Sequence, residues 1–191
     1  MIVSTEKKFI FAAIPKTGTS SIEKVLGKYS DEKLEDGLVK HVHLRKVKDL
    51  LDKPYYKFCF FRNPWDRMVS LYHYHLRQGN FFLNQTYDEF TFDDWIKKTK
   101  VTGTNPDRQT DYIMLRGRII PGVAIYKFEE MEDSWKHICG VLKIDEELPH
   151  INKSKHIHYS EYYTEESKRI VGSYCYGEIK MMGYKFEKGE L

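Results

Sequence analysis

Short apolar runs alternate along the chain with segments in which apolar residues recur every three or four positions. The runs at 9–14, 56–61 and 123–128 are almost wholly apolar, which predicts strands buried on both faces, as in a parallel sheet. Helical spacing follows each of these runs. This alternation predicts an α/β fold in which helices flank a central parallel sheet, and in such folds ligands bind at the carboxyl ends of the strands.

Further helices are expected outside these strand–loop–helix repeats. One covers 44–51 and stops before a proline, and the last substantial one covers 164–176. Another begins after Thr91, which forms a capping-box pattern with Asp94. No change in composition marks a boundary, so we expect one domain over 1–191.

Overall composition narrows the class of protein. A net charge of +3 is too weakly basic for a dedicated nucleic-acid-binding protein. The cysteines, Cys59, Cys139 and Cys175, are widely spaced and odd in number, which disfavours a disulfide framework or a zinc site and favours the reducing cytoplasm. No apolar run reaches the roughly 18 residues of a membrane span, so a soluble protein is expected.

The segment 15–21, Pro-Lys-Thr-Gly-Thr-Ser-Ser, lies between the first strand and the helix after it. Its flexible glycine, its hydroxyl groups and the positive helix terminus suit a nucleotide 5′-phosphate. In the P-loop of ATPases the lysine follows the last glycine, whereas Lys16 precedes Gly18, and this order disfavours a kinase or ATPase. Taken alone, the segment also fits an ordinary turn before a capped helix.

A second candidate anion site follows the second strand. Arg62 ends that strand, and Ser70 lies nearly two turns into the next helix. A guanidinium fork and a hydroxyl group can hold a second phosphate. The plainer interpretation is that Arg62 and Arg67 form surface ion pairs with acids such as Asp66.

In combination and order, these two segments resemble the sulfotransferases that use 3′-phosphoadenosine 5′-phosphosulfate (PAPS), especially carbohydrate sulfotransferases and their small bacterial relatives. Segment 14–21 resembles their 5′-phosphosulfate loop and segment 61–72 their 3′-phosphate motif, and weaker similarity extends through 126–131, 148–154 and 183–186. The resemblance implies a P-loop-like, three-layer α/β fold. It also implies an enzyme that transfers a sulfuryl group from PAPS to a hydroxyl of an acceptor and releases 3′-phosphoadenosine 5′-phosphate (PAP). The acceptor that the resemblance implies is a carbohydrate.

The resemblance assigns donor-binding roles to individual residues. It implies that the 5′ end of the donor is held by Lys16, Thr17, Gly18, Thr19 and Ser20, and its 3′-phosphate by Arg62 and Ser70. Lys153 and Ser154 lie in a segment that resembles one that closes over the nucleotide in relatives. A solvated basic loop is the plainer interpretation of this segment. Arg108-Gln109 resembles an acceptor-side segment, and surface polarity explains these two residues nearly as well.

Sulfuryl transfer by in-line displacement requires a cation for the leaving oxygen and a base for the acceptor hydroxyl. Lys16 is the candidate cation. The base is expected in the His41-Val42-His43 pair, and the residue types do not choose between the two histidines. The same pair could instead be an ordinary loop pair. No carboxylate or cysteine set completes a zinc site with the histidines, so no metal is expected.

Two other functions stay open from the sequence. A nucleotide kinase or phosphotransferase would require a metal-dependent reaction with ATP. A non-catalytic nucleotide-binding module would keep the fold and lack turnover. For the enzyme, basic residues at 40, 45, 46 and 48 suit an acidic glycan, and they equally suit a solvated helix face.

Overall fold

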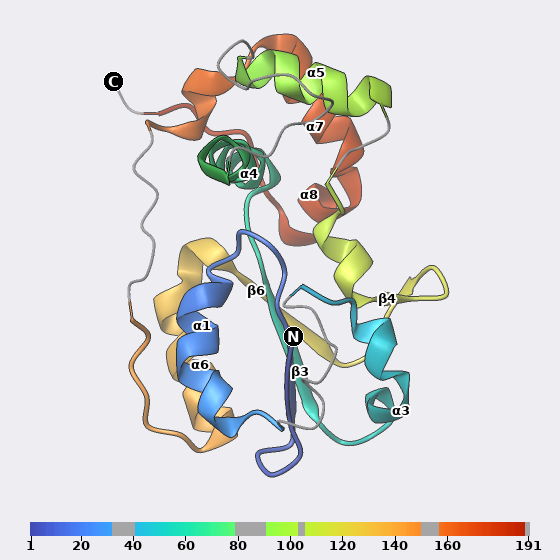
Figure 1. Cartoon of the computed structure of the whole chain (residues 1–191), viewed down its shortest axis with the longest axis vertical. Helices are drawn as coiled ribbons and strands as arrows, with labels where there is room; N and C mark the ends of the chain where they lie inside the picture. The colour runs from blue at the N-terminus through green and yellow to red at the C-terminus, as the bar shows by residue number, and fades with distance from the viewer. Residues whose placement is uncertain (32–40, 79–90, 103–105, 150–156, 190–191) are drawn as a thin grey trace. The chain divides into compact units, whose positions relative to one another are not determined.

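The computed structural model describes residues 1–31, 41–78, 91–102, 106–149 and 157–189 (Figure 1). The chain forms two compact units. The first comprises Met1–Arg62 and Arg108–Lys153, and the second comprises Asn63–Asp107 and Ser154–Leu191. Each unit has its own set of packed elements, so each is described by itself.

The sheet of the first unit has the order β1-β2-β3-β6, made of β1 (Ile2–Ser4), β2 (Phe9–Ala12), β3 (Tyr56–Phe61) and β6 (Val123–Lys127). β2, β3 and β6 are parallel, with Phe11 opposite Phe58 and Phe60 opposite Tyr126. The predicted parallel sheet is thus confirmed. β1 pairs antiparallel with β2 and was not expected, because its apolar run is too short to stand out in the sequence.

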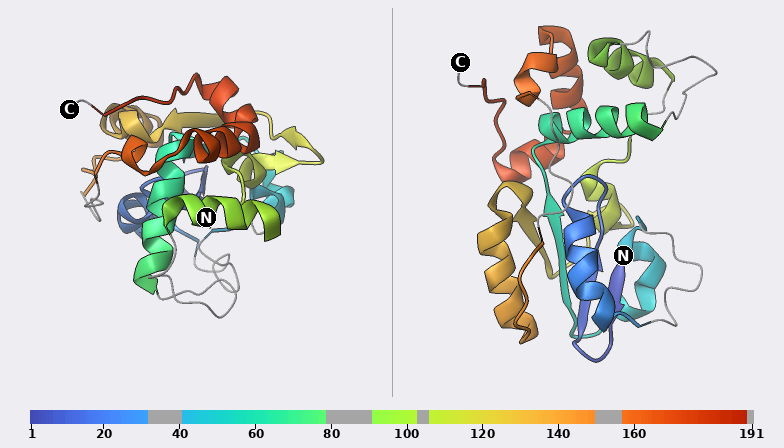
Figure 2. Two further views of the ribbon diagram at one scale, coloured as in Figure 1. Left: turned by 90° about the horizontal axis from the view of Figure 1, so that it is seen from above. Right: turned by 60° about the vertical axis from the view of Figure 1, so that its left-hand side comes forward.

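Helices cover one face of this sheet (Figures 1 and 2). α1 (Thr19–Leu26) and α6 (Met131–Leu142) lie on the same side of it, with the short 3₁₀ helices Gly27–Tyr29 and Phe128–Glu130 at their ends. Apolar side chains of the strands and of both helices form one buried core, which includes Phe9, Phe11, Phe58, Phe60, Ile22, Leu26, Trp135 and Ile138. The helical spacing predicted after the first and third strands is therefore confirmed by burial.

Shorter elements lie on the other side of the sheet (Figures 1 and 2). They are the 3₁₀ helix Leu44–Val47, α3 (Lys48–Leu51), the 3₁₀ helix Gln109–Ile113 and the hairpin of β4 (Met114–Leu115) and β5 (Arg118–Ile119). Leu44 and Ile113 are fully buried. The hairpin turns at Arg116 and Gly117, which both have a positive φ. A two-residue turn needs this conformation in order to match the twist of the two strands.

The second unit is helical. Its elements are α4 (Pro64–Gln78), α5 (Phe92–Thr102), the 3₁₀ helix Tyr159–Tyr162, α7 (Glu165–Tyr174) and α8 (Tyr176–Met182). Pro64 opens α4, and the Asn63 side chain accepts a hydrogen bond from the Trp65 N–H at 3.1 Å, which caps the helix. Aromatic rings of α4 and α5 pack edge to face, with the Tyr72 and Phe92 centroids 5.5 Å apart.

The helix predicted over 164–176 is confirmed as α7, and a further helix, α8, follows it. α7 ends at Tyr174, and α8 begins after Cys175 and stops at Gly183, whose φ is 68°. α8 has seven residues, and the buried one among them is the charged Glu178 rather than an apolar residue. The sequence pattern therefore did not indicate this helix. Within the described residues, no helix is both long and apolar enough to cross a membrane.

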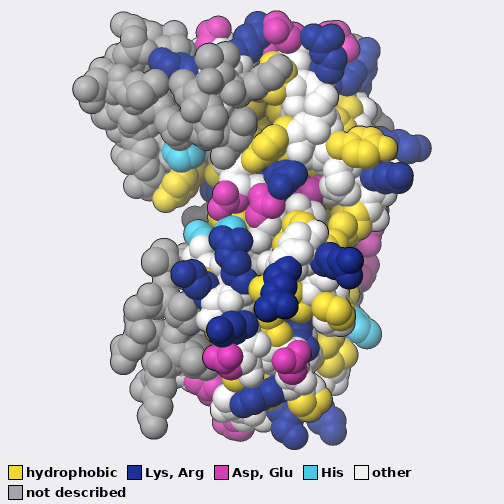
Figure 3. All heavy atoms as spheres, turned by 90° about the vertical axis from the view of Figure 1, so that its right-hand side faces the viewer, with side chains coloured by type: hydrophobic (Ala, Val, Ile, Leu, Met, Phe, Trp, Pro, Cys, Tyr) yellow, Lys and Arg dark blue, Asp and Glu magenta, His cyan; other side chains and the backbone are white. Residues whose placement is uncertain are grey.

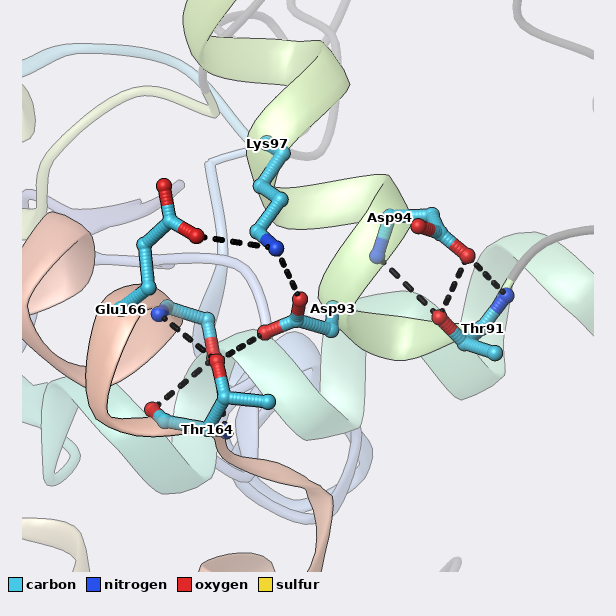
Figure 4. A network of polar contacts seen from close by, with 7 residues as sticks. Thr91, Asp93, Asp94, Lys97, Thr164 and Glu166 are labelled. Carbon is cyan, nitrogen blue, oxygen red and sulfur yellow. Dashed lines mark hydrogen bonds and ion pairs between the residues drawn. The ribbon is translucent and has the colours of Figure 1, made fainter.

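Two threonine caps hold the ends of α5 and α7 (Figure 4). The Thr91 hydroxyl accepts from the Asp94 N–H at 3.2 Å while the Asp94 carboxylate accepts from the Thr91 N–H at 3.3 Å, so the predicted capping box is confirmed. The Thr164 hydroxyl accepts from the Ser167 N–H at 3.2 Å and donates to Asp93. This second bond ties α7 to α5.

Asp93 is the charged centre of this network. Its carboxylate pairs with Lys97 at 2.7 Å, and Lys97 also reaches Glu166 on α7 at 3.0 Å (Figure 4). Desolvation opposes ionisation of Asp93, but hydrogen bonds from Lys97, Thr164 and Ser167 outweigh it and lower its pKa to about 2. The network therefore persists at neutral pH and weakens only as the pH falls below about 4, towards the pKa of the folded state.

Replacing Thr164 with alanine should destabilise the protein more than replacing Thr91. Thr91→Ala removes a cap and an exposed hydrogen bond to Asp94 within α5, for which we expect a loss of about 0.5–1 kcal/mol in the free energy of unfolding. Thr164→Ala removes a cap and also the hydrogen bond to Asp93, for which we expect about 1–2 kcal/mol. Urea titration followed by circular dichroism measures both. Equal losses would contradict a role for Thr164 in joining α7 to α5.

Candidate functional site

The loop between β2 and α1 adopts backbone conformations that few residues tolerate. Lys16 has a φ of 70° and Gly18 a φ of 76°. A Cβ atom on Gly18 would lie 2.6 Å from the Met131 side chain and 3.1 Å from the Phe128 ring. Glycine is therefore required at 18 by both backbone conformation and space. Strained backbone of this kind is concentrated at functional sites, so the loop is the first candidate.

The loop is closed by one of its own hydroxyl groups and leads into a helix terminus. Thr17 is fully buried and donates to the Ile14 carbonyl at 3.0 Å, so its side chain shapes the loop. Gly18 stands at the N-cap of α1, where the described residues provide no side-chain cap and no acid in the first turn. The positive end of α1, with the buried Thr19 and half-buried Ser20, is therefore arranged to receive an anion.

Arg62, which follows the last residue of β3, is tied to this same loop. Its Nη1 donates to the Lys16 carbonyl at 3.2 Å, and its guanidinium carbon lies 4.6 Å from the centre of the Phe128 ring. Only 7% of Arg62 is exposed. The structure thus brings the two cationic residues predicted from separate motifs to one loop, at the edge where β2, β3 and β6 all end.

Gln109 contacts the backbone of Arg62. Its Nε2 donates to the Arg62 carbonyl at 3.0 Å, and its Oε1 accepts from the Arg62 N–H at 2.8 Å. Gln109 is fully buried, so the interpretation of this residue as surface polarity is wrong. Neither Gln109 nor Phe128 was predicted as part of the donor site, because neither polarity nor spacing reveals a contact with a distant loop.

The two candidate histidines have different surroundings. Nδ1 of His41 lies 2.8 Å from the carbonyl oxygen of Ala13, which immediately precedes the phosphate-loop segment. His43 begins the 3₁₀ helix Leu44–Val47, and its ring packs against Tyr112 with centroids 4.5 Å apart. His41 is therefore bonded to the chain that leads into the loop of Lys16, whereas His43 packs on a neighbouring element.

The other predicted site residues are distributed as follows. Ser70 lies on α4 of the second unit and is buried, with 3% of its surface exposed. Arg67 of the same helix is also buried and donates to the Asp107 carbonyl at 3.0 Å, so a surface ion pair is the wrong interpretation of this arginine. Arg108 is exposed and pairs with Asp111 at 3.1 Å. Lys153 and Ser154 lie outside the described residues.

Metal-ligating groups do not gather in the described part of the chain. There, no cluster of three or more histidine, cysteine, aspartate or glutamate side chains could hold a metal ion. The features that the structure does assemble are cationic and hydroxylated, with a helix terminus beside them. These features bind phosphate and sulfate groups directly.

Comparisons with known proteins agree with this chemistry. The model of the sulfotransferase family matches residues 1–174, which include both phosphate segments. The mouse sulfotransferase SULT7A1, whose crystal structure was solved in complex with PAP, has a similar fold, with a TM-score of 0.56 and 15% identity over 95% of this chain and 86% of that chain. No curated protein matches at a significant level. Because the family match spans nearly the whole chain, the chain belongs to the sulfotransferase family.

Proposed function

We propose that the chain transfers the sulfuryl group of PAPS to a hydroxyl of a carbohydrate. The observation that carries the proposal is the strained β2–α1 loop, in which the backbone of Lys16 is bonded by Arg62 beside an uncapped helix terminus. Such a loop suits a ligand with two separate anionic groups. Lys16 and the helix terminus can bind one group, and Arg62 can bind the other. The mouse relative bound to PAP supports the choice of nucleotide.

Each part of the donor has its own proposed partners. The backbone of residues 16–20, the Lys16 ammonium group and the hydroxyl groups of Thr19 and Ser20 hold the 5′-phosphosulfate, while Thr17 keeps the loop closed. Arg62 holds the 3′-phosphate. Ser70 is proposed as a second partner of the 3′-phosphate because of its place in the sequence motif. That Lys153 and Ser154 close over the nucleotide stays a prediction.

In the proposed reaction, the acceptor oxygen forms a bond to sulfur while the bond from sulfur to the 5′-phosphate oxygen breaks. The hydroxyl proton passes to a base, and the leaving oxygen keeps the bonding electrons as part of PAP. Lys16 stabilises the negative charge that develops on that oxygen. Because no covalent intermediate is required, positioning and electrostatics supply the rate acceleration.

His41 is the better candidate for the base. A carbonyl oxygen can only accept a hydrogen bond, so the contact with Ala13 keeps the proton of neutral His41 on Nδ1. The lone pair is then on Nε2, which is the form that a general base needs. The ring of His43 instead packs at a tilt against Tyr112.

An acidic glycan is the acceptor class that suits the surface of the first unit. The exposed cations Arg45, Lys46, Lys48, Arg116 and Arg118 belong to the 3₁₀ helix at 44–47, to α3 and to the β4–β5 hairpin, which packs beside that 3₁₀ helix. Figure 3 shows lysine and arginine side chains gathered in its lower half, over the elements on the right of Figure 1. No ion pair joins these five side chains to an acid among the described residues. Such a surface attracts carboxylated or sulfated sugars.

Two further expectations accompany the proposal. A cytoplasmic location stays a prediction, and the free thiols of Cys59, Cys139 and Cys175 are compatible with it. A reaction that needs no metal also stays a prediction. In phosphoryl transfer, metal ions neutralise the charge that develops on the reacting oxygens. The cationic groups of Lys16 and Arg62 can take that role here.

The donor assignment is tested by the affinity for the 3′-phosphate. We expect wild-type protein to bind PAP more tightly than AMP or ATP in calorimetric titrations without added metal. Arg62→Ala should weaken PAP binding by on the order of 2 kcal/mol, because it removes a charged hydrogen-bond donor. It should weaken AMP binding less, because AMP has no 3′-phosphate and is affected only through the contact of Arg62 with the Lys16 loop. Arg108→Ala is the matched control, since that arginine is exposed and paired with Asp111. Equal affinity of wild-type protein for PAP and AMP would refute the assignment.

Replacing His41 should slow the chemical step selectively. With radiolabelled PAPS and chondroitin as probe acceptor, we expect His41→Ala to lower kcat by about a hundredfold or more while PAP affinity is kept. His43→Ala should have a smaller effect, because its ring supports the packing on Tyr112. A larger loss of kcat in His43→Ala than in His41→Ala would reverse the choice of base.

Reversing charges on the hairpin should weaken acceptor binding without affecting chemistry. We expect the double variant Arg116→Glu, Arg118→Glu to raise KM for chondroitin about tenfold at low salt, with kcat retained and a shallower dependence on salt. Lys136→Glu on α6 is the control, because its side chain is 79% exposed and lies on another element. An equal rise of KM per reversed charge in both variants would show that only the net charge matters.

A further inference from the structure

Gln109 completes the hydrogen bonding of a backbone position that the sheet leaves open. The ladder between β3 and β6 ends where Phe61 pairs with Lys127, so Arg62 is the first residue beyond it. The Gln109 amide, from the start of the 3₁₀ helix Gln109–Ile113, supplies both a donor and an acceptor to that residue. A primary amide is the side chain that copies this donor–acceptor pair of a neighbouring strand.

Other side chains do not satisfy this position. An ionised glutamate has no N–H to give to the Arg62 carbonyl and would place two oxygens against each other. A methionine fills a similar volume and leaves the N–H and the carbonyl of Arg62 without these partners. Because Gln109 is fully buried, water does not replace the lost hydrogen bonds without rearrangement of the backbone.

The backbone direction at Arg62 determines where its guanidinium points. That group is held by the Lys16 carbonyl and by the face of the Phe128 ring, and both contacts require the side chain to leave β3 in one direction. A bidentate contact with a phosphate tolerates little error in that direction. A change in the hydrogen bonding of the Arg62 backbone therefore changes what the guanidinium binds.

We infer that Gln109 is a positioning residue that sets the preference for a 3′-phosphorylated nucleotide through the backbone of Arg62. This inference rests on the proposed function, because it takes Arg62 as the partner of the 3′-phosphate. Gln109 itself does not contact the donor. Its neighbour Arg108 has a separate role, since it pairs with Asp111 in a capping box and holds the start of the same 3₁₀ helix.

The test is the ratio of the affinities for PAP and AMP, which differ only in the 3′-phosphate. We expect Gln109→Met to lower this ratio about tenfold, equivalent to about 1.4 kcal/mol, while AMP affinity is kept. In the double variant with Arg62→Ala, Gln109→Met should cause no further loss, because both changes act on the same contact. Asp111→Asn is the matched control, since it disturbs the cap of the same 3₁₀ helix without touching Arg62.

A merely structural role gives a different result. It would lower the melting temperature of Gln109→Met and leave the ratio at its wild-type value, and this outcome overturns the inference. If Gln109→Met does not fold, Gln109→Glu is measured in the same way, because it keeps the acceptor for the Arg62 N–H and replaces the donor to the Arg62 carbonyl with an oxygen. If Arg62→Ala itself leaves the ratio unchanged, the proposed 3′-phosphate contact fails first, and the inference about Gln109 fails with it.

Discussion

Parallel pairing of β2, β3 and β6 is the constraint on which the candidate site depends. β2 is completely buried, and β3 nearly so, and their backbone groups have no water to bind, so they must pair within the ladder. Parallel strands all end at the same edge. The segments that leave this edge are the loop of Lys16, the backbone of Arg62 and the 3₁₀ helix at Phe128, and they meet for that reason.

Arg62 joins these segments into one arrangement. Its guanidinium bonds the backbone of one loop and stacks on a ring from another, while its own backbone is paired by Gln109. Two cationic residues, Lys16 and Arg62, are thereby attached to the same loop. Two cationic residues on the loop that leads into the N-terminus of α1 favour an anionic ligand there. The folding of this edge and its suitability for a nucleotide have the same physical origin.

Gly18 shows how packing and chemistry coincide at one position. Its conformation turns the chain from β2 into α1, and the absence of a side chain lets Met131 and Phe128 pack against the loop. Phe128 also supports Arg62. The loop is consequently supported by the element that follows β6, far away in the sequence, as well as by its own hydrogen bond from Thr17.

Much of the fold was predictable because its signals are local. Buried parallel strands are continuous apolar runs, and the cap at Thr91 is a short-range hydrogen bond between neighbours in the chain. β1 and α8 were missed. The strand is held by pairing with β2, and α8 has seven residues of which Glu178 is the buried one, so neither has a local pattern that stands out.

The amino-acid sequence by itself determined the family of the protein, the cationic and hydroxylated residues of its two phosphate motifs, and the strands and helices that carry them. The family follows from the resemblance of the two motifs to known sulfotransferases, and local spacing and residue chemistry suffice for the other properties. Only the tertiary structure decided that Arg62 bonds the loop of Lys16, that Gln109 is a buried partner of Arg62, and that His41 is bonded through Nδ1. Each of these contacts joins residues far apart in the chain. Their geometry depends on the order and register of the strands, which no single segment specifies.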